Sequence, residues 1–173
     1  LEEEAQLTLV GRLLARAEIA RILESRLRTE KIFHDHPEIE EEEIIAPVFV
    51  TGIARTGTSI LHELLWRDPG NRAPITWEMM YPAAAVATSK KDSALTIERA
   101  ENEVRMQDHV LPAMRTMHEL GAELPNECIY IFAHEFACDM FTGFFHVPSY
   151  TMWKAGLDPQ PAYSYHRRFL KLL

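Results

Sequence analysis

Cysteine is scarce in this sequence, and so are uninterrupted apolar runs and surplus positive charge. Cys128 and Cys138 are the only cysteines among 173 residues. Two cysteines are too few for a disulfide framework, so a reducing compartment, the cytoplasm, is expected. The chain does not open with a basic stretch followed by an apolar one, so no secretory signal is expected.

The most apolar window of the sequence, residues 128–147, also carries ionisable side chains. It contains His134, Glu135, Asp139 and His146. Four such groups in one window argue against a membrane span. The formal net charge is −8, whereas proteins that bind nucleic acids usually present basic surfaces. We therefore expect neither a membrane span nor a nucleic-acid partner.

Three regions of regular pattern are present. Residues 1–37 predict one long amphipathic helix that ends at His36-Pro37, because the residue before a proline avoids the helical region. Residues 44–67 predict a strand, a loop and a helix, and residues 92–173 predict further helices. The inner face expected for the first helix is formed by Leu7, Val10, Leu14, Ala17, Ile22 and Leu27. The main interpretation of that helix is a cover over the domain, with a dimer seam, and hence a homo-oligomer, as the alternative.

The rest of the chain is organised around residues 52–59, GIARTGTS. A short β-rich run, residues 48–50, precedes this loop, and a helical pattern follows from Ile60. In a strand–loop–helix unit of this kind, backbone N–H groups and the positive end of the helix dipole bind an anion. The structural alternative is a turn followed by an ordinary helix cap, since Thr and Ser are preferred caps.

The loop lacks the lysine that triphosphate chemistry needs. Gly52 and Gly57 have the spacing of G-x-x-x-x-G-K-[ST], but Thr58 stands at the lysine position. Arg55 places a guanidinium inside the loop instead, which suits a phosphate or a sulfate. The hydroxyl groups come from Thr56, Thr58 and Ser59. These donors predict an anion site without an obligatory metal, and His34 and His36 have no third zinc ligand near them.

Residues 47–82, PVFVTGIARTGTSILHELLWRDPGNRAPITWEMMYP, resemble the 5′-phosphosulfate loop region of the sulfotransferases. The similarity is greatest to the bacterial, often actinobacterial, branch, whose loop reads roughly G-[LI]-x-R-[TS]-G-T-[TS]. The RDPGNRAP turn and the Trp77-Glu78 pair strengthen the resemblance. It implies the donor 3′-phosphoadenosine 5′-phosphosulfate (PAPS), no metal, and an acceptor hydroxyl on a small molecule, carbohydrate or lipid.

The resemblance also implies an α/β, P-loop-type sulfotransferase fold, in which helices flank a parallel sheet. We expect this chain to be mostly helical, with one strand at 48–50 and a doubtful second one at 72–78. A strand that is apolar on both faces belongs inside a covered sheet, and two strands alone are marginal. Residues 1–173 are therefore expected to form a single, incomplete domain. The arginine and serine that contact the 3′-phosphate in the family have no counterpart here.

Arg55 and Glu78 are the expected catalytic residues. Sulfuryl transfer builds negative charge on the leaving oxygen, which the Arg55 cation would stabilise. The donor is expected to bind through Arg55, Thr56, Gly57, Thr58 and Ser59. Glu78 resembles the glutamate base of the tyrosine-protein and bacterial carbohydrate branches. Its structural alternatives are a helix cap or an ion pair with Arg72.

Weaker candidates for the base are Glu127, His109, His118 and His134. Glu127 is expected in the first turn of a helix, and none of the three histidines has a partner that the sequence identifies. The aromatic residues of 136–153 predict core packing, with the wall of an acceptor pocket as the alternative. Two other functions stay open: a P-loop kinase, which would require magnesium and ATP, and a catalytically silent helical scaffold.

Overall fold

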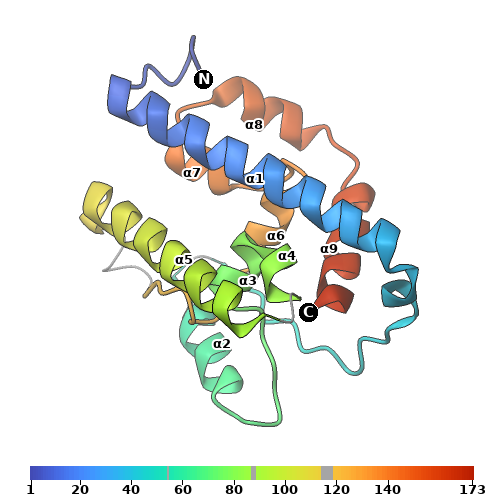
Figure 1. Ribbon diagram of the computed structural model, residues 1–173. Helices are drawn as coiled ribbons and strands as arrows, with labels where there is room; N and C mark the ends of the chain where they lie inside the picture. Colours follow the sequence, from blue (N-terminus) through green and yellow to red (C-terminus); the bar gives the residue numbers. More distant parts are fainter. Residues whose placement is uncertain (54, 87–88, 114–118) are drawn as a thin grey trace. The chain divides into compact units, whose positions relative to one another are not determined.

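A computed structural model describes residues 1–53, 55–86, 89–113 and 119–173 of the chain (Figure 1). These residues form two compact units. Unit 1 comprises Leu1–Glu41 and Cys128–Leu172, and unit 2 comprises Glu42–Glu127 with Leu173. No helix in the described part of the chain is long and apolar enough to cross a membrane.

Unit 1 is built around a long N-terminal helix. Its elements are α1 (Leu9–Asp35), the 3₁₀ turn η1 (Pro37–Glu41), α6 (Ile129–Ala133), α7 (Met140–Phe144), α8 (Pro148–Ala155) and α9 (Gln160–Leu172). The hydroxyl of Thr8 accepts a hydrogen bond from the Gly11 amide at 3.2 Å and so caps α1. The helix ends at Asp35, with His36 as its C-cap just before Pro37, as the sequence predicts. Helix α9 is one of the further helices that residues 92–173 predict.

The inner face that the sequence predicts for α1 is wrong at most positions. Ile22 is buried, but Val10 and Leu27 are 62% and 69% exposed. The buried positions of the helix are Ala15, Arg21, Ile22, Ser25, Thr29 and Phe33. Ala15, Ser25 and Thr29 on this face are small, whereas most leucines of the helix are exposed. Hydrophobicity alone therefore picked the wrong face of the helix.

Aromatic side chains fill the core of unit 1. Ile22 of α1 packs with Ala133, Cys138, Met140 and Phe141, and partly buried aromatic rings surround this cluster. The hydroxyl of Tyr150 donates to the carbonyl oxygens of Phe136 (2.8 Å) and Cys138 (2.9 Å). These bonds hold the turn at Phe136, whose φ of 53° lies in the left-handed region. The core interpretation of residues 136–153 is thus confirmed for Phe136, Phe141 and Tyr150, whereas Trp153 is 53% exposed.

Unit 2 contains the expected anion-binding region. Its elements are α2 (Thr58–Trp66), α3 (Thr76–Met80), α4 (Pro82–Ala85) and α5 (Lys90–Val110). The hydroxyl of Ser89 caps α5 by accepting the Asp92 amide at 3.3 Å, so this helix begins slightly before the helical region expected from residue 92. Ala100 and Val104 form the buried side of α5.

Residues 74–76 and residues 124–126 lie side by side in unit 2 and are joined by hydrogen bonds. The Thr76 amide donates to the Leu124 carbonyl (3.0 Å), and the Asn126 amide donates to the Pro74 carbonyl (3.2 Å). The Asn126 side chain also donates to the Thr76 hydroxyl at 3.1 Å. Thr76 and Asn126 are both buried, so these bonds satisfy polar groups that water does not reach.

The two expected strands are wrong for the described residues. Residues 48–50 are extended without pairing, and Val48 and Phe49 are 74% and 66% exposed. In 72–78 the only β-type pairing is an isolated bridge between Ile75 and Pro125, after which α3 begins. A strand needs a neighbour for its backbone hydrogen bonds, and the described part of the chain provides none beside residues 48–50. The helix expected from Leu124 is also wrong there, because α6 begins only at Ile129.

Candidate functional site

Gly52 and Gly57 both occupy positions of the 52–59 loop where a residue with a side chain would fit poorly. Gly57 has φ of 88°, a conformation that other residues rarely adopt. At Gly52, an added Cβ would lie 2.9 Å from Cγ2 of Thr58 and 3.0 Å from Oγ1 of Thr56. The loop therefore curls tightly enough over Gly52 that a larger side chain would push those two threonines aside.

The N-terminus of α2 carries no side-chain cap. Gly57 occupies the N-cap position, and no side chain accepts a hydrogen bond there. The short helices α4, α6, α7 and α8 also lack a side-chain cap, whereas the first turns of α1 and α5 are capped by the hydroxyls of Thr8 and Ser89. Among described residues, the amides of Thr58 and Ser59 donate no hydrogen bond, and the first amide that does is that of Leu61, to the Gly57 carbonyl at 3.0 Å. A cap by a Thr or Ser side chain, which the structural alternative suggested, is therefore not present among these residues.

Hydroxyl groups and a guanidinium accompany these amides. The Thr56 hydroxyl donates to the Ile53 carbonyl at 2.6 Å, which closes the loop. Within the described part of the chain, the hydroxyls of Thr58 and Ser59 make no hydrogen bond, so both can donate to a ligand. Arg55 is exposed, and its φ of 69° is another left-handed conformation. Strain of this kind at a residue with a side chain is common where function needs a particular backbone shape.

Glu78 lies in the first turn of α3 with both carboxylate oxygens engaged. Oε1 accepts from Arg72 at 3.1 Å, and Oε2 accepts from the Ile75 amide at 3.2 Å. The Glu78 side chain is 15% exposed. Both structural alternatives that the sequence suggested, the cap and the ion pair, therefore occur together. No bond between described residues joins Glu78 to the 52–59 loop.

The other candidate bases are scattered. His134 is buried in unit 1, where its Nδ1 lies 2.9 Å from the Tyr165 hydroxyl, so its role there is structural. His109 and Glu127 are exposed, and Glu127 precedes α6 instead of starting a helix. His118 lies outside the described residues. None of the described ones contacts the 52–59 loop in a recorded hydrogen bond or ion pair.

The sequence analysis did not predict one polar cluster of unit 2, formed by Tyr81, Arg99 and Glu103. The Tyr81 hydroxyl donates to Oε1 of Glu103 at 2.6 Å, and the Arg99 side chain donates to the same oxygen at 3.1 Å. The Arg99 guanidinium also lies over the Tyr81 ring, 4.9 Å from its centroid. The four-residue spacing of Arg99 and Glu103 on a helix could have revealed half of this cluster. The contribution of Tyr81 depends on the tertiary fold.

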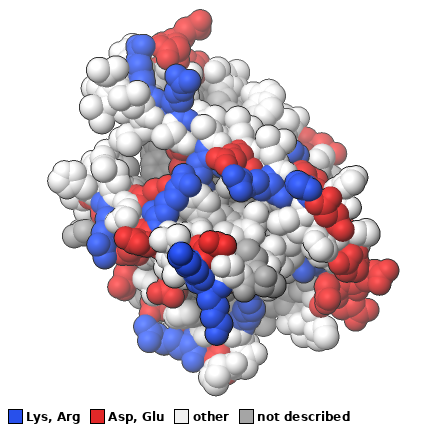
Figure 2. Space-filling view, viewed as in Figure 1, with Lys and Arg blue, Asp and Glu red and all other residues white. Residues whose placement is uncertain are grey.

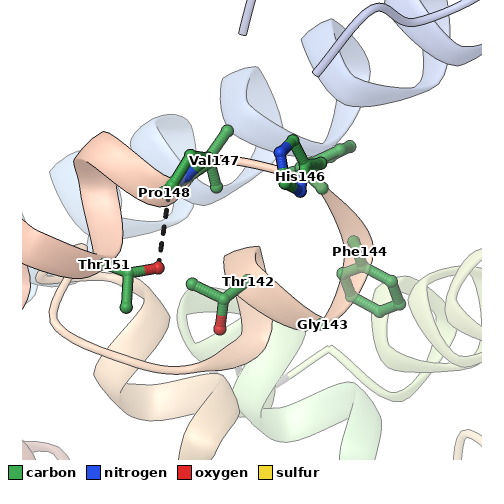
Figure 3. Close-up of a pocket in the computed structure, with 8 residues that line it drawn as sticks. Thr142, Gly143, Phe144, His146, Val147, Pro148 and Thr151 are labelled. Atoms are coloured by element: carbon green, nitrogen blue, oxygen red, sulfur yellow. Dashed lines mark hydrogen bonds between the residues drawn. The ribbon is translucent and has the colours of Figure 1, made fainter. Parts of the chain in front are cut away.

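An open pocket of about 400 Å³ lies in unit 1, where α7 turns into α8 (Figure 3). Phe144, Phe145 and Val147 give it apolar walls, and His146 lies at the connecting turn. Thr142 and Thr151 contribute hydroxyls, and Thr151 donates to the Val147 carbonyl at 3.4 Å. A pocket of this size with aromatic walls and a few polar groups can hold part of a small organic molecule.

Charge does not mark a second site. On the face drawn in Figure 2, basic and acidic side chains alternate, apart from one acidic group at the right edge. Within the described ranges, no group of three or more His, Cys, Asp or Glu side chains is placed to hold a metal ion.

Comparison with known proteins identifies the family. The model of the sulfotransferase family matches residues 47–173, which include the 52–59 loop and α2. The chain belongs to the sulfotransferase family. This membership agrees with the resemblance that residues 47–82 carry. No curated protein matches the chain.

Two solved sulfotransferases are similar in structure. STF1 from Mycobacterium tuberculosis H37Rv is 28% identical, with a TM-score of 0.75 over 99% of this chain and 47% of its own. STF9 from Mycobacterium avium is 26% identical, with a TM-score of 0.75 over 96% of this chain and 43% of its own. The chain thus spans less than half the length of each of these sulfotransferases.

Proposed function

We propose that the protein is a PAPS-dependent sulfotransferase and that residues 52–59 hold the 5′-phosphosulfate of the donor. The uncapped N-terminus of α2 is the observation that carries this proposal. Among the described residues, no side chain accepts a hydrogen bond from its first amides, and a helix N-terminus with such amides favours an anion. The full fold would be the P-loop-type sulfotransferase fold, with a parallel sheet beside α2.

The identity of the anion follows from the donor set. Thr58 replaces the lysine of triphosphate loops, and Arg55 supplies the positive charge from within the loop. A guanidinium binds a tetrahedral oxyanion through paired hydrogen bonds without a metal ion. These features favour a phosphosulfate over magnesium-bound ATP, and so a sulfotransferase over a kinase.

In the proposed reaction, the acceptor oxygen forms a bond to sulfur as the bond from sulfur to the bridging phosphate oxygen breaks. Arg55 and the α2 amides stabilise the negative charge that grows on the leaving oxygen. Glu78 takes the proton of the acceptor hydroxyl. A carboxylate has about four lone-pair positions, and the two hydrogen bonds to Glu78 leave positions for that proton. The acceptor is a small molecule, carbohydrate or lipid.

Titration of the full-length protein with 3′-phosphoadenosine 5′-phosphate tests the donor site, because this product analogue has the 5′-phosphate but nothing to transfer. We expect calorimetric binding in EDTA that magnesium does not strengthen. Binding of ATP only with magnesium would indicate a kinase instead. No binding of either nucleotide would indicate a silent scaffold.

Removing the loop cation tests the assignment of Arg55. Arg55→Ala should weaken binding of the analogue about 10- to 100-fold, the usual value of a hydrogen-bonded charge contact, and should abolish transfer of ³⁵S-labelled sulfate. Arg67→Ala is the matched control, because Arg67 is an exposed arginine just after α2 that pairs with Glu63. Equal affinity in the two variants would contradict the role of Arg55.

A further inference from the structure

Helix α1 has a second apolar stripe, opposite its buried face. Leu9, Leu13, Leu23 and Leu27 are 75%, 61%, 45% and 69% exposed. At about 100° per residue, this stripe is centred about 160° from the buried positions that include Ile22 and Thr29. A helix that only covered a domain would turn charged residues outward here.

The spacing of the stripe is that of a coiled-coil seam. Leu9, Leu13, Arg16, Ala20, Leu23 and Leu27 follow one another at intervals of 4, 3, 4, 3 and 4 residues. All six side chains are exposed. Intervals of this kind are typical of contact with one other helix, and Val10 and Leu14, which are 62% and 36% exposed, extend the apolar surface beside the stripe. The partner that fits the stripe is therefore a helix.

The stripe is also complementary to itself when two copies run in opposite directions. A two-fold axis at the level of Glu18 pairs Leu9 with Leu27 of the second copy and Leu13 with Leu23. It also pairs Arg16 with Ala20. A two-fold interface requires this kind of self-complementarity, because the same patch lies on both sides of it.

Arg16 determines the direction of the pairing. A parallel, in-register pair would place the two Arg16 side chains against each other in the seam, and like charges there repel. In the antiparallel pair each Arg16 meets the small Ala20, which leaves room for its guanidinium to reach water. Among the described residues, Arg16 has no ion pair that would have to break.

We propose that α1 forms an antiparallel, two-fold homodimer through this stripe. From Leu9 to Leu27 the stripe is roughly 27 Å long at 1.5 Å per residue, which is short for a specific interface. The dimer is therefore weak, and it forms in the micromolar concentration range. This inference does not depend on the chemistry of the 52–59 loop.

Disulfide cross-linking of the full-length protein tests both the contact and its direction. In the antiparallel dimer, Leu13→Cys faces Leu23→Cys of the other copy. Each variant alone would leave its own two sulfurs roughly 15 Å apart along the axis, which is too far for a disulfide. We therefore expect a cross-linked dimer when the two variants are mixed under mild oxidation, and none from either variant alone. Unaltered protein reports any cross-link through the native Cys128.

Cross-linking of each single variant with itself would show a parallel dimer and overturn the proposal. The absence of any cross-link in the mixture would show that α1 is free or covered by another part of the protein, which also overturns it.

Sedimentation velocity through the micromolar range gives a second measurement. Leu23→Glu should weaken self-association by about tenfold or more, as expected for a central apolar contact. Leu95→Glu is the matched control, because Leu95 is also an exposed leucine, 57% against 45% for Leu23, on another helix, α5. Equal effects of the two substitutions, or a monomer at every concentration of the unaltered protein, would contradict the proposal.

Discussion

Glu78 combines two structural contacts with the proposed role of base. Oε1 pairs with Arg72 and Oε2 accepts the Ile75 amide, so the carboxylate orients the start of α3 whether or not it takes part in catalysis. Loss of activity after its removal would therefore be ambiguous. A substitution that keeps the hydrogen bond to the Ile75 amide but prevents proton transfer is more informative.

Glu78→Gln is such a substitution. The amide oxygen of glutamine can still accept the Ile75 hydrogen bond, but the side chain cannot take a proton. We expect kcat to fall at least about 100-fold, the lower end of the usual contribution of a general base, with a change in Tm of only a few degrees. Steady-state kinetics with saturating donor and a thermal melt of the same sample measure both effects.

Arg72→Gln provides the comparison for this substitution, because it breaks the ion pair and leaves the carboxylate in place. It should retain most of the turnover. If Glu78→Gln retained full turnover as well, Glu78 would have only the two structural contacts.

At the residue scale, the sequence identified the loop and both alternatives for Glu78. It could not identify the left-handed backbone of Arg55, because nothing in the residue type favours φ of 69° there. The sequence also could not reveal that the first turn of α2 has no side-chain cap, because Thr58 and Ser59 are both good capping residues. The shape of the anion site thus depends on backbone conformation, which residue types constrain only weakly.

At the scale of helices, boundaries were easier to predict than faces. The C-terminal end of α1 and the presence of α9 followed from a proline and from apolar periodicity, whereas α1 begins at Leu9 and not at the start of residues 1–37. The buried face of α1 did not, because it is made of small and polar residues such as Ser25 and Thr29, and the Thr29 hydroxyl donates to the Ser25 carbonyl at 2.8 Å. Internal hydrogen bonds of this kind make a polar residue compatible with burial.

Helix α9 carries a buried histidine that was not singled out from the sequence. His166 is 6% exposed and stacks on Phe132, with 4.9 Å between ring centroids. Its Nε2 is buried and has no hydrogen-bond partner among the described residues. Burial lowers the pKa of His166 below its ordinary value near 6.5. The folded state therefore binds this proton less readily than the unfolded state does.

His166 should make the protein less stable in mild acid. Because its pKa is lowered on folding, the free energy of unfolding is highest above pH 6.5 and falls as the pH drops from 6.5 toward the folded-state pKa. His166→Phe keeps the aromatic stacking and removes the unpaired nitrogen. We expect it to flatten this pH dependence and to raise stability at pH 5 by about 1 kcal/mol, the lower end of the cost of an unpaired buried polar group.

Urea denaturation at a series of pH values between about 5 and 8, which spans the ordinary histidine pKa, measures this effect. His34→Gln is the control, because the side chain of His34 is 88% exposed. An unchanged pH dependence in His166→Phe would mean that other groups cause the acid sensitivity.

At the scale of the whole molecule, two units are joined by exposed chain. One of the two connections passes through Glu42, Glu43 and Ala46, all exposed and outside any helix. The neighbouring Glu40 differs, because its carboxylate pairs with Arg168 of α9. A backbone segment without helix contacts or buried side chains is where proteases cut first.

Limited digestion with a glutamate-specific protease should therefore cut first after Glu42 or Glu43. Mass spectrometry of the earliest products should show a fragment that begins at residue 43 or 44. Glu24 and Glu101 serve as internal controls, because both lie inside helices. Earlier cleavage at either of them would contradict this division of the chain.

The absence of a sheet from the described residues also belongs to the scale of the whole molecule. The buried strand that the sequence predicted at residues 48–50 does not form there, and Val48 is exposed because the described chain offers it no partner strand. Ile60 and Leu64 of α2 are likewise 68% and 61% exposed. An apolar residue pattern indicates that a segment is suited to pack against another element. The segment becomes buried only where that element is present.

The uncapped first turn of α2 has a consequence for buffer conditions. The donors proposed for the anion are peptide N–H groups, hydroxyls and one guanidinium, and groups of these kinds do not ordinarily change protonation between about pH 5 and 9. The affinity of the proposed site for a fully ionised oxyanion should therefore change little with pH across that interval, and any pH optimum of turnover would arise from the deprotonation of the acceptor hydroxyl.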